Sequence, residues 1–226
     1  MNKTTVTNLI IILSLALAIF AAPVSPMIAV TGASGNVAAG NVSDLRSFVD
    51  QVATSDNAKV VAGVYAEDLM SAPVVQQPAS NPGYVSEKSG VVTQFGMTAQ
   101  FGNVALLAHN FLQGAAFFNL NVDSNLTLVY GDGTTRKYAV TEVLRYQALS
   151  PLDPYTDFVD LNSGNNERIT VETLFNDVYT RSDVLILQTC IENNGNDSWG
   201  RLFVIAEPVT QTLGEKLAVQ TLSYIQ

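Results

Sequence analysis

The 226-residue chain carries 20 acidic and 11 basic side chains, a formal net charge of −9. Because nucleic-acid and anionic-membrane binding draw on clustered Lys and Arg, this balance argues against nucleic-acid binding. The single cysteine, Cys190, excludes an intramolecular disulfide, and with only one histidine, His109, a zinc site of the Cys/His type is excluded as well.

The N-terminal segment is apolar and uncharged. Residues 4–42 contain no charged side chain, and residues 9–22 are almost continuously apolar behind Lys3. This pattern predicts a signal peptide or signal anchor over residues 1–30, forming a hydrophobic helix. No clean small-x-small cleavage site stands out, which favours an uncleaved anchor. The positive-inside rule then predicts a cell-membrane protein with an extracytoplasmic domain, or a secreted one if the segment is cleaved.

Residues 31–90 are expected to hold a linker and the N-terminal part of the domain. Residues 31–40 are small and rich in Gly, Ser, Ala and Asn, as in flexible linkers. A short helix capped by Ser43 should follow, because an apolar stripe then recurs at helical spacing. The Pro, Ser, Asn and Gly content of residues 73–90 predicts an irregular connection. The stripe consists of Leu45, Phe48, Val49 and Val52.

Strand signals dominate the rest of the chain. Glycines in Gly131-Asp132-Gly133 supply the positive φ of a hairpin turn. Residues 150–166 are predicted to form a long loop, which in a compact domain is usually functional or disordered, and residues 171–178 a short helix. Many short strands with brief helices predict an all-β barrel or sandwich. The expected strands are residues 91–96, 104–108, 126–130, 137–146, 184–189 and 202–206.

The two unique residues each close an apolar strand-like run, and Arg201 opens the next run after Cys190. A thiolate nucleophile needs a proton-transfer partner, and a hairpin between Cys190 and Arg201 would set both side chains at one rim. There Arg201 would stabilise an oxyanion and His109 would protonate a leaving amine. The alternatives are an inert buried cysteine, a satisfied polar histidine, and an Arg201 that pairs with Glu207 or Glu192. Arg168 and Arg181 rank behind Arg201.

Four stretches carry a family resemblance, and the hairpin over residues 126–146 lies between the second and the third. They are Leu106-Leu107-Ala108-His109, Phe117-Phe118-Asn119-Leu120, Leu187-Gln188-Thr189-Cys190 and Arg201-Leu202-Phe203-Val204. Together they resemble the sortase family, the cysteine transpeptidases of bacterial cell surfaces. In that family a cysteine closes Thr-Leu-x-Thr-Cys, a histidine follows a small residue at a strand end, Phe-x-x-Leu comes next, and an arginine opens the strand after the cysteine.

The resemblance maps the nucleophile to Cys190, the acid/base to His109 and the oxyanion donor to Arg201, with Thr189 as a substrate-binding candidate. The departures are Ile186 where threonine is usual, Ala108 where glycine often stands, and Asn110 after the histidine. The resemblance implies an all-β, closed sortase-type barrel of about eight strands with short peripheral helices. Residues 91–208 would be the catalytic core and residues 209–226 a C-terminal tail.

The resemblance also implies the activity. The enzyme would cleave a sorting motif, often of the Leu-Pro-x-Thr-Gly kind, in secreted or surface proteins and pass the acyl group to an amine on the cell wall or a pilin. It implies no required cofactor or metal, although acidic loops at Asp153, Asp157 and Asp160 and at residues 192–197 leave calcium open. Two other functions stay open: a non-catalytic surface binding module, and a cysteine hydrolase that uses water as the acceptor.

Overall fold

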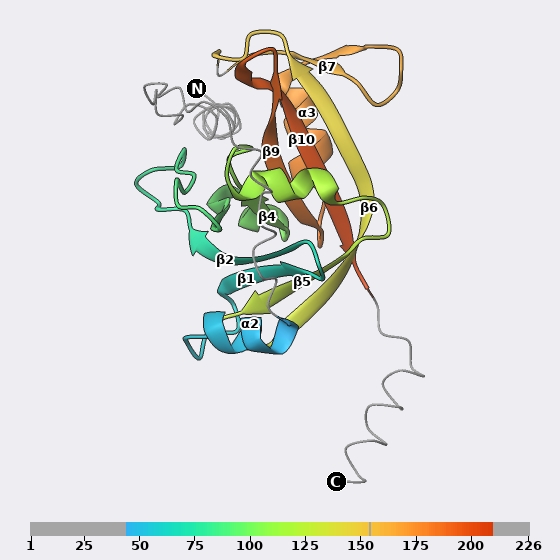
Figure 1. The fold of residues 1–226 in the computed structure, drawn as a ribbon. Helices are drawn as coiled ribbons and strands as arrows, with labels where there is room; N and C mark the ends of the chain where they lie inside the picture. The colour runs from blue at the N-terminus through green and yellow to red at the C-terminus, as the bar shows by residue number, and fades with distance from the viewer. Residues whose placement is uncertain (1–43, 154, 210–226) are drawn as a thin grey trace, which may run out of the picture.

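The computed structural model describes residues 44–153 and 155–209. In this part of the chain, ten strands and four short helices form one sheet with peripheral helices (Figure 1). The helices are α2 (Leu45–Val52), η1 (Gly96–Phe101), η2 (Gln113–Asn119) and α3 (Val171–Tyr179). The strands are β1 (Val61–Ala66), β2 (Met70–Gln76), β3 (Val92–Gln94), β4 (Val104–Leu107), β5 (Asn125–Tyr130), β6 (Thr135–Ala148), β7 (Phe158–Asp160), β8 (Arg168–Ile169), β9 (Leu185–Asn193) and β10 (Asn196–Pro208).

The sheet closes on itself. The strand order is β10-β9-β4-β3-β2-β1-β5-β6, and β10 pairs again with β6, so these eight strands form a ring. Strands β7 and β8 extend the sheet beyond β6. The pairs β2–β3 and β4–β9 are parallel, whereas the other pairs are antiparallel. The predicted closed all-β barrel is confirmed; its N-terminal hydrophobic helix falls on residues 1–30, outside the described residues.

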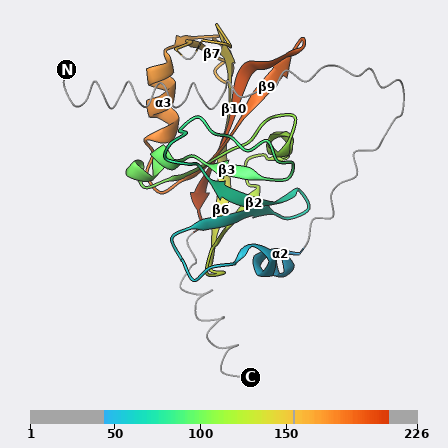
Figure 2. The ribbon, with the colours of Figure 1, turned by 90° about the vertical axis from the view of Figure 1, so that its left-hand side faces the viewer.

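Alternate side chains along the strands pack in two different apolar clusters, one inside the barrel and one on its outer face. In β9, Leu185 and Leu187 pack in the interior cluster, whereas Ile186 packs in a second cluster on the outer face. The outer cluster includes Phe175 and Tyr179 of α3, which therefore covers that face. Figures 1 and 2 show α3 along one side of the barrel and α2 at the end opposite β7. The outer face of the barrel is thus packed against α3 through a second apolar cluster, which can hold side chains on that face in place.

Helix α2 forms close to its predicted position. Its N-cap is Asp44, whose carboxylate accepts the Ser47 N–H at 3.1 Å, so the prediction of a Ser43 cap was wrong. The acidic residue stands one position nearer the helix and satisfies an amide that would otherwise be unpaired. Phe48 and Val52 are buried against β1 and β5, a contribution of roughly 1.5–3 kcal/mol per side chain.

Two predictions of irregular structure were wrong. Strand β2 covers Pro73 to Gln76, inside the segment expected to be an irregular connection, and it pairs with β1. Pro73 is tolerated because its pairing with β1 ends at that residue, while pairing with β3 starts at Val74. The expected loop over residues 150–166 contains β7, which pairs with β6 through Tyr146 and Asp160.

The β5–β6 hairpin forms where it was predicted, but of its two turn glycines only Gly133 has positive φ, so that role was wrong for Gly131. Gly133 has a φ of +83°. Gly131 allows the turn to pack closely against Ser55, since a Cβ at Gly131 would lie 2.3 Å from Ser55 Oγ. The helix predicted at residues 171–178 is α3. None of the helices within residues 44–153 and 155–209 is long and apolar enough to cross a bilayer, and the predicted anchor lies outside those residues.

Candidate active site

The three residues singled out from the sequence lie side by side: Cys190 and Arg201 are on adjacent strands, and His109 follows the end of β4, which pairs with the other edge of β9. Leu107 of β4 pairs with Gln188 of β9 in parallel register, and the Ala108 N–H donates to the Gln188 carbonyl at 3.2 Å. Continuing both chains brings His109 beside Cys190. Arg201 of β10 is the direct antiparallel partner of Cys190. We call His109, Cys190 and Arg201 the three-residue row.

The three-residue row lies on the outer face of the barrel. Side chains alternate along a strand, so Cys190 leaves the sheet on the same side as Ile186, which packs in the outer cluster. Arg201 is on the same side as Phe203, another member of that cluster. The face that α3 supports therefore also carries the row.

One detail of the prediction was wrong. Cys190 does not end its strand and Arg201 does not open the next one, because β9 continues to Asn193 and β10 starts at Asn196. The apolar pattern ends near Cys190, but backbone pairing continues into the polar hairpin. The hairpin that joins them was predicted correctly, and it makes Cys190 and Arg201 direct cross-strand partners.

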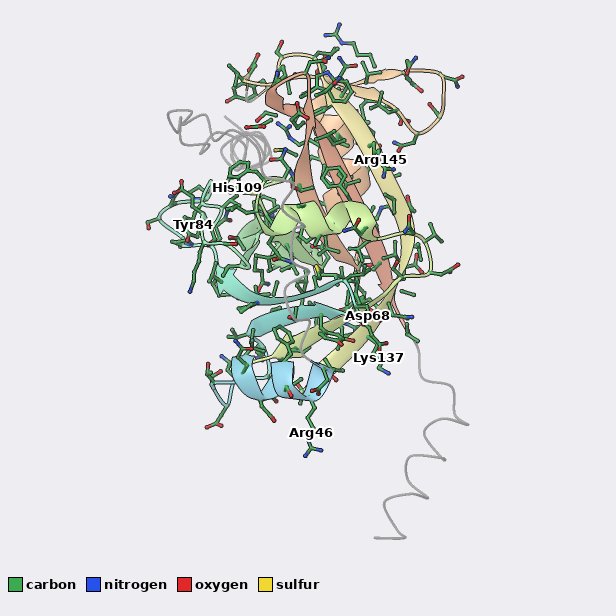
Figure 3. All side chains as sticks on the ribbon, viewed as in Figure 1. Arg46, Asp68, Tyr84, His109, Lys137 and Arg145 are labelled. Atoms are coloured by element: carbon green, nitrogen blue, oxygen red, sulfur yellow. The ribbon has the colours of Figure 1, made fainter. Side chains whose placement is uncertain are left out.

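His109 is buried, with 7% of its surface exposed. Its ring stacks on Phe111 with centroids 5.2 Å apart and an interplanar angle of 15°. Burial lowers the pKa of His109, while the Glu87 carboxylate and a hydrogen bond to the Val85 backbone oppose that shift. Nε2 is buried and has no hydrogen-bond partner among the described residues, so no described group competes for its proton. The His109 side chain is labelled in Figure 3.

Cys190 is a free, half-buried thiol. Together with His109 it lines a small pocket of about 10 Å³. A space of that size holds about one water-sized group. The pocket thus offers access to the sulfur beside the imidazole. Its other lining residues are Val85, Leu107, Ala108, Gln188 and Thr189.

Arg201 is buried, with 1% of its surface exposed. Its Nη1 donates to the carbonyl oxygens of Ser198 at 2.9 Å and Gly200 at 2.7 Å. Burial lowers the pKa of the guanidinium, and Cys190 and Tyr179 nearby oppose that shift. Nε and Nη2 have no partner in the described part of the chain. Two donors of the guanidinium are therefore buried and unpaired among the described residues.

The other arginines considered from the sequence are engaged elsewhere. Arg168 Nη2 lies 2.7 Å from the Asp157 carboxylate, and Arg181 pairs with Glu142. Of the two acidic partners proposed for Arg201, Glu192 accepts the Gly195 N–H at 2.6 Å. No ion pair within residues 44–153 and 155–209 involves Arg201.

Thr189 points away from the row. Its side chain is 2% exposed, and its hydroxyl donates to the Ala108 carbonyl at 2.8 Å, which ties β9 to β4. A substrate contact by Thr189 stays a prediction.

A polar pair that was not predicted from the sequence lies beside the three-residue row. The Tyr179 hydroxyl of α3 donates to Gln188 Oε1, and both side chains are buried. Burial raises the pKa of Tyr179 well above its ordinary value, and Arg201 opposes this, which places the phenol near the guanidinium. A glutamine inside the apolar run over residues 184–190 was the signal that could have revealed it.

Among the described residues, no three His, Cys, Asp or Glu side chains gather as a metal site would require. Asp157 is instead held by Arg168, and Asp160 Oδ1 accepts the Asn162 N–H at 2.7 Å.

No protein-family model matches the chain, and no curated protein sequence does. Several solved structures align with it. Sortase E1 from Streptomyces coelicolor, solved with a tripeptide in its active site, is 18% identical over 68% of this chain and 90% of its own, with a TM-score of 0.42. Sortase C1 from Streptococcus suis is 13% identical, with 75% and 83% coverage and a TM-score of 0.45. Sortase C-1 from Actinomyces oris is 15% identical, with 74% and 81% coverage and a TM-score of 0.44.

Because these three TM-scores are below 0.5, the function is inferred from this chain's own side chains. All three of these aligned structures are sortases. The closed ring of eight strands is the barrel architecture that the sequence analysis predicted.

Proposed function

We propose that this chain is a sortase-like cysteine transpeptidase. It cleaves a sorting motif in secreted proteins, holds the acyl part as a thioester on Cys190, and transfers it to a cell-surface amine. The observation that carries the proposal is the three-residue row, in which a free thiol lies between the chain's only imidazole and a buried guanidinium with two unpaired donors. A nucleophile, a proton carrier and an oxyanion donor are thus adjacent.

Acylation begins with the thiol proton. His109 is held neutral by burial, so its unpaired Nε2 takes the proton from Cys190, and the sulfur attacks the scissile carbonyl carbon. As the S–C bond forms, the carbonyl oxygen becomes an oxyanion. Nε and Nη2 of Arg201 then donate hydrogen bonds to it. Preorganised charged donors in a dry site stabilise such an intermediate strongly.

Transfer completes the cycle. The tetrahedral intermediate collapses, the C–N bond breaks, and His109 gives its proton to the leaving amine, which produces the thioester. An acceptor amine then attacks the thioester carbon and loses a proton to His109. The C–S bond breaks, and the proton returns to Cys190. Water in place of the amine gives hydrolysis, so the acceptor alone separates a transpeptidase from a hydrolase.

The three side chains supply every proton and charge that these steps require, so the proposal includes no cofactor. We place the reaction outside the cytoplasm because of the uncharged apolar segment at residues 1–30. The substrates would be secreted or surface proteins that carry a sorting motif, and the acceptor an amine of the cell wall or a pilin.

Mass spectrometry tests the proposal. The full chain is incubated with a panel of sorting-motif peptides, with and without excess triglycine, and the intact protein and the peptides are weighed. We expect a thioester adduct without triglycine and a ligated peptide with it. Because the chain has one cysteine, the adduct is assigned by its absence in Cys190→Ala. Cleavage without ligation would indicate the hydrolase. Neither adduct nor cleavage across the panel would refute both enzymes and leave the binding module.

A further inference from the structure

The turn that follows His109 packs against β9 with no room for a side chain at Gly114. A Cβ at this position would lie 2.2 Å from Thr189 Oγ1, 2.7 Å from the His109 carbonyl oxygen and 2.8 Å from the Ala108 carbonyl oxygen. Two of these three atoms belong to the backbone and cannot swing away. Gly114 is not among the residues with positive φ, so space alone requires glycine there.

The same turn fixes the backbone on both sides of the histidine. The His109 carbonyl accepts the N–H groups of Leu112 and Gly114, each at 3.0 Å. The preceding carbonyl, of Ala108, accepts the Thr189 hydroxyl at 2.8 Å. The peptide groups before and after the His109 Cα are therefore both held by hydrogen bonds, and one of these bonds comes from the residue next to Cys190.

Two further contacts of this turn restrict the orientation of the His109 ring. Phe111, 51% exposed, stacks on the imidazole at 5.2 Å. Asn110 Nδ2 donates to the Asp197 carbonyl of β10 at 3.1 Å, which ties the turn to the strand that carries Arg201. The turn is thus attached to both strands of the row.

We propose that Gly114 and Thr189 are positioning residues for His109, a role that rests on the proposed function for its effect on turnover. Gly114 lets the turn approach closely enough to bind the His109 carbonyl, and Thr189 holds the Ala108 carbonyl. Together they set the imidazole against the Cys190 sulfur. Neither contacts the substrate in this role. A displacement of about 1 Å at a catalytic group can reduce turnover by about 100-fold.

The test compares two glycine substitutions. In Gly114→Ala the new methyl group meets the three atoms above, whereas in Gly96→Ala the nearest atom is Gln77 Oε1 at 3.9 Å. We expect kcat/KM for peptide cleavage to fall by about 100-fold in Gly114→Ala and to be unchanged in Gly96→Ala. The imidazole resonance, which is unique because the chain has one histidine, should shift its titration midpoint in Gly114→Ala only.

Substitutions at Thr189 provide a second test of the positioning role, which applies even if Gly114→Ala does not fold. Thr189→Val keeps the shape and removes the hydroxyl, whereas Thr189→Ser keeps the hydroxyl. We expect Thr189→Val to shift the His109 titration midpoint and slow turnover more than Thr189→Ser. If the folded variants lower the unfolding temperature but leave the midpoint unchanged, the residues only pack the core and the proposal is overturned. The titration needs no peptide, so it stands even if the wild-type chain cleaves none.

Discussion

Arg201 and Cys190 lie directly opposite each other on antiparallel strands β10 and β9, so both side chains leave the sheet on the same face. Cross-strand partners have Cβ atoms roughly 4.5–5.5 Å apart. The guanidinium is buried and has no acidic partner among the described residues. Its Nη1 is satisfied by two backbone carbonyls, while the remaining donors stay free beside the thiol.

Arg201→Lys should remove most of the oxyanion stabilisation. A lysine keeps the charge but cannot both donate to the Ser198 and Gly200 carbonyls and present a planar fork to the oxyanion. We expect kcat to fall by about 10²- to 10³-fold with a much smaller change in KM, measured by steady-state peptide cleavage. Arg168→Lys, at an exposed pair with Asp157, is the matched control and should leave kcat unchanged. Equal losses in the two variants would contradict this role.

Activity should decline on the acid side with a midpoint below about 6.5, the usual pKa of histidine. Burial lowers the pKa of His109, and the protonated imidazole cannot accept the thiol proton. The pH dependence of kcat/KM measures this midpoint, and the titration of the single imidazole resonance should agree with it. A midpoint above the usual histidine value would contradict the neutral resting state.

The same pKa shift predicts a change in stability. The folded chain binds the His109 proton less tightly than the unfolded chain does. The contribution of the neutral His109 to the free energy of unfolding is therefore complete above the unfolded pKa of about 6.5. This contribution is lost as the pH falls through the folded pKa of His109. Urea unfolding across this range should show a steeper acid loss for the wild type than for His109→Gln. Parallel curves would show that the imidazole titrates equally in both states.

Glu87 should raise the pKa of His109. Its exposed carboxylate opposes the lowering of the His109 pKa, so Glu87→Gln should move the imidazole midpoint to lower pH. Because the carboxylate is exposed, the difference between the variants should shrink in high salt. Glu172→Gln, on α3, serves as a control for the loss of one negative charge. A midpoint that moves equally in both variants would reveal a general charge effect only.

Tyr179→Phe should destabilise the fold although it keeps the ring. The substitution leaves Gln188 Oε1 buried without its donor, which costs about 1–3 kcal/mol in the free energy of unfolding. Replacing both polar partners, as in Tyr179→Phe with Gln188→Leu, should recover much of the loss. Urea denaturation measures both. If the double variant is less stable than the single one, the Tyr179–Gln188 bond is not the cause.

Local patterns in the sequence predicted most strands and the chemical identity of the site. Apolar runs and the Gly131–Gly133 turn are local signals that extend over a few residues, so β3, β4, β5, β6, β9 and β10 were located. The short strands β7 and β8 were missed because they lie in or next to the segment predicted to be a loop. Strands β1 and β2 were missed because small residues and Pro73 weaken their pattern. Tyr179 was missed because its polar partner, Gln188, lies in a strand that otherwise reads as apolar.

The sequence by itself determined which residues could react, because the chain has one cysteine and one histidine, each at the end of an apolar run. Only the tertiary structure decided that they meet. Thr189 bonds to a carbonyl 81 residues away, and the barrel closes through the pairing of β10 with β6. Such contacts depend on the register of strands distant in sequence, which no local pattern specifies. The unpaired donors of Arg201 and the close packing at Gly114 follow from that register.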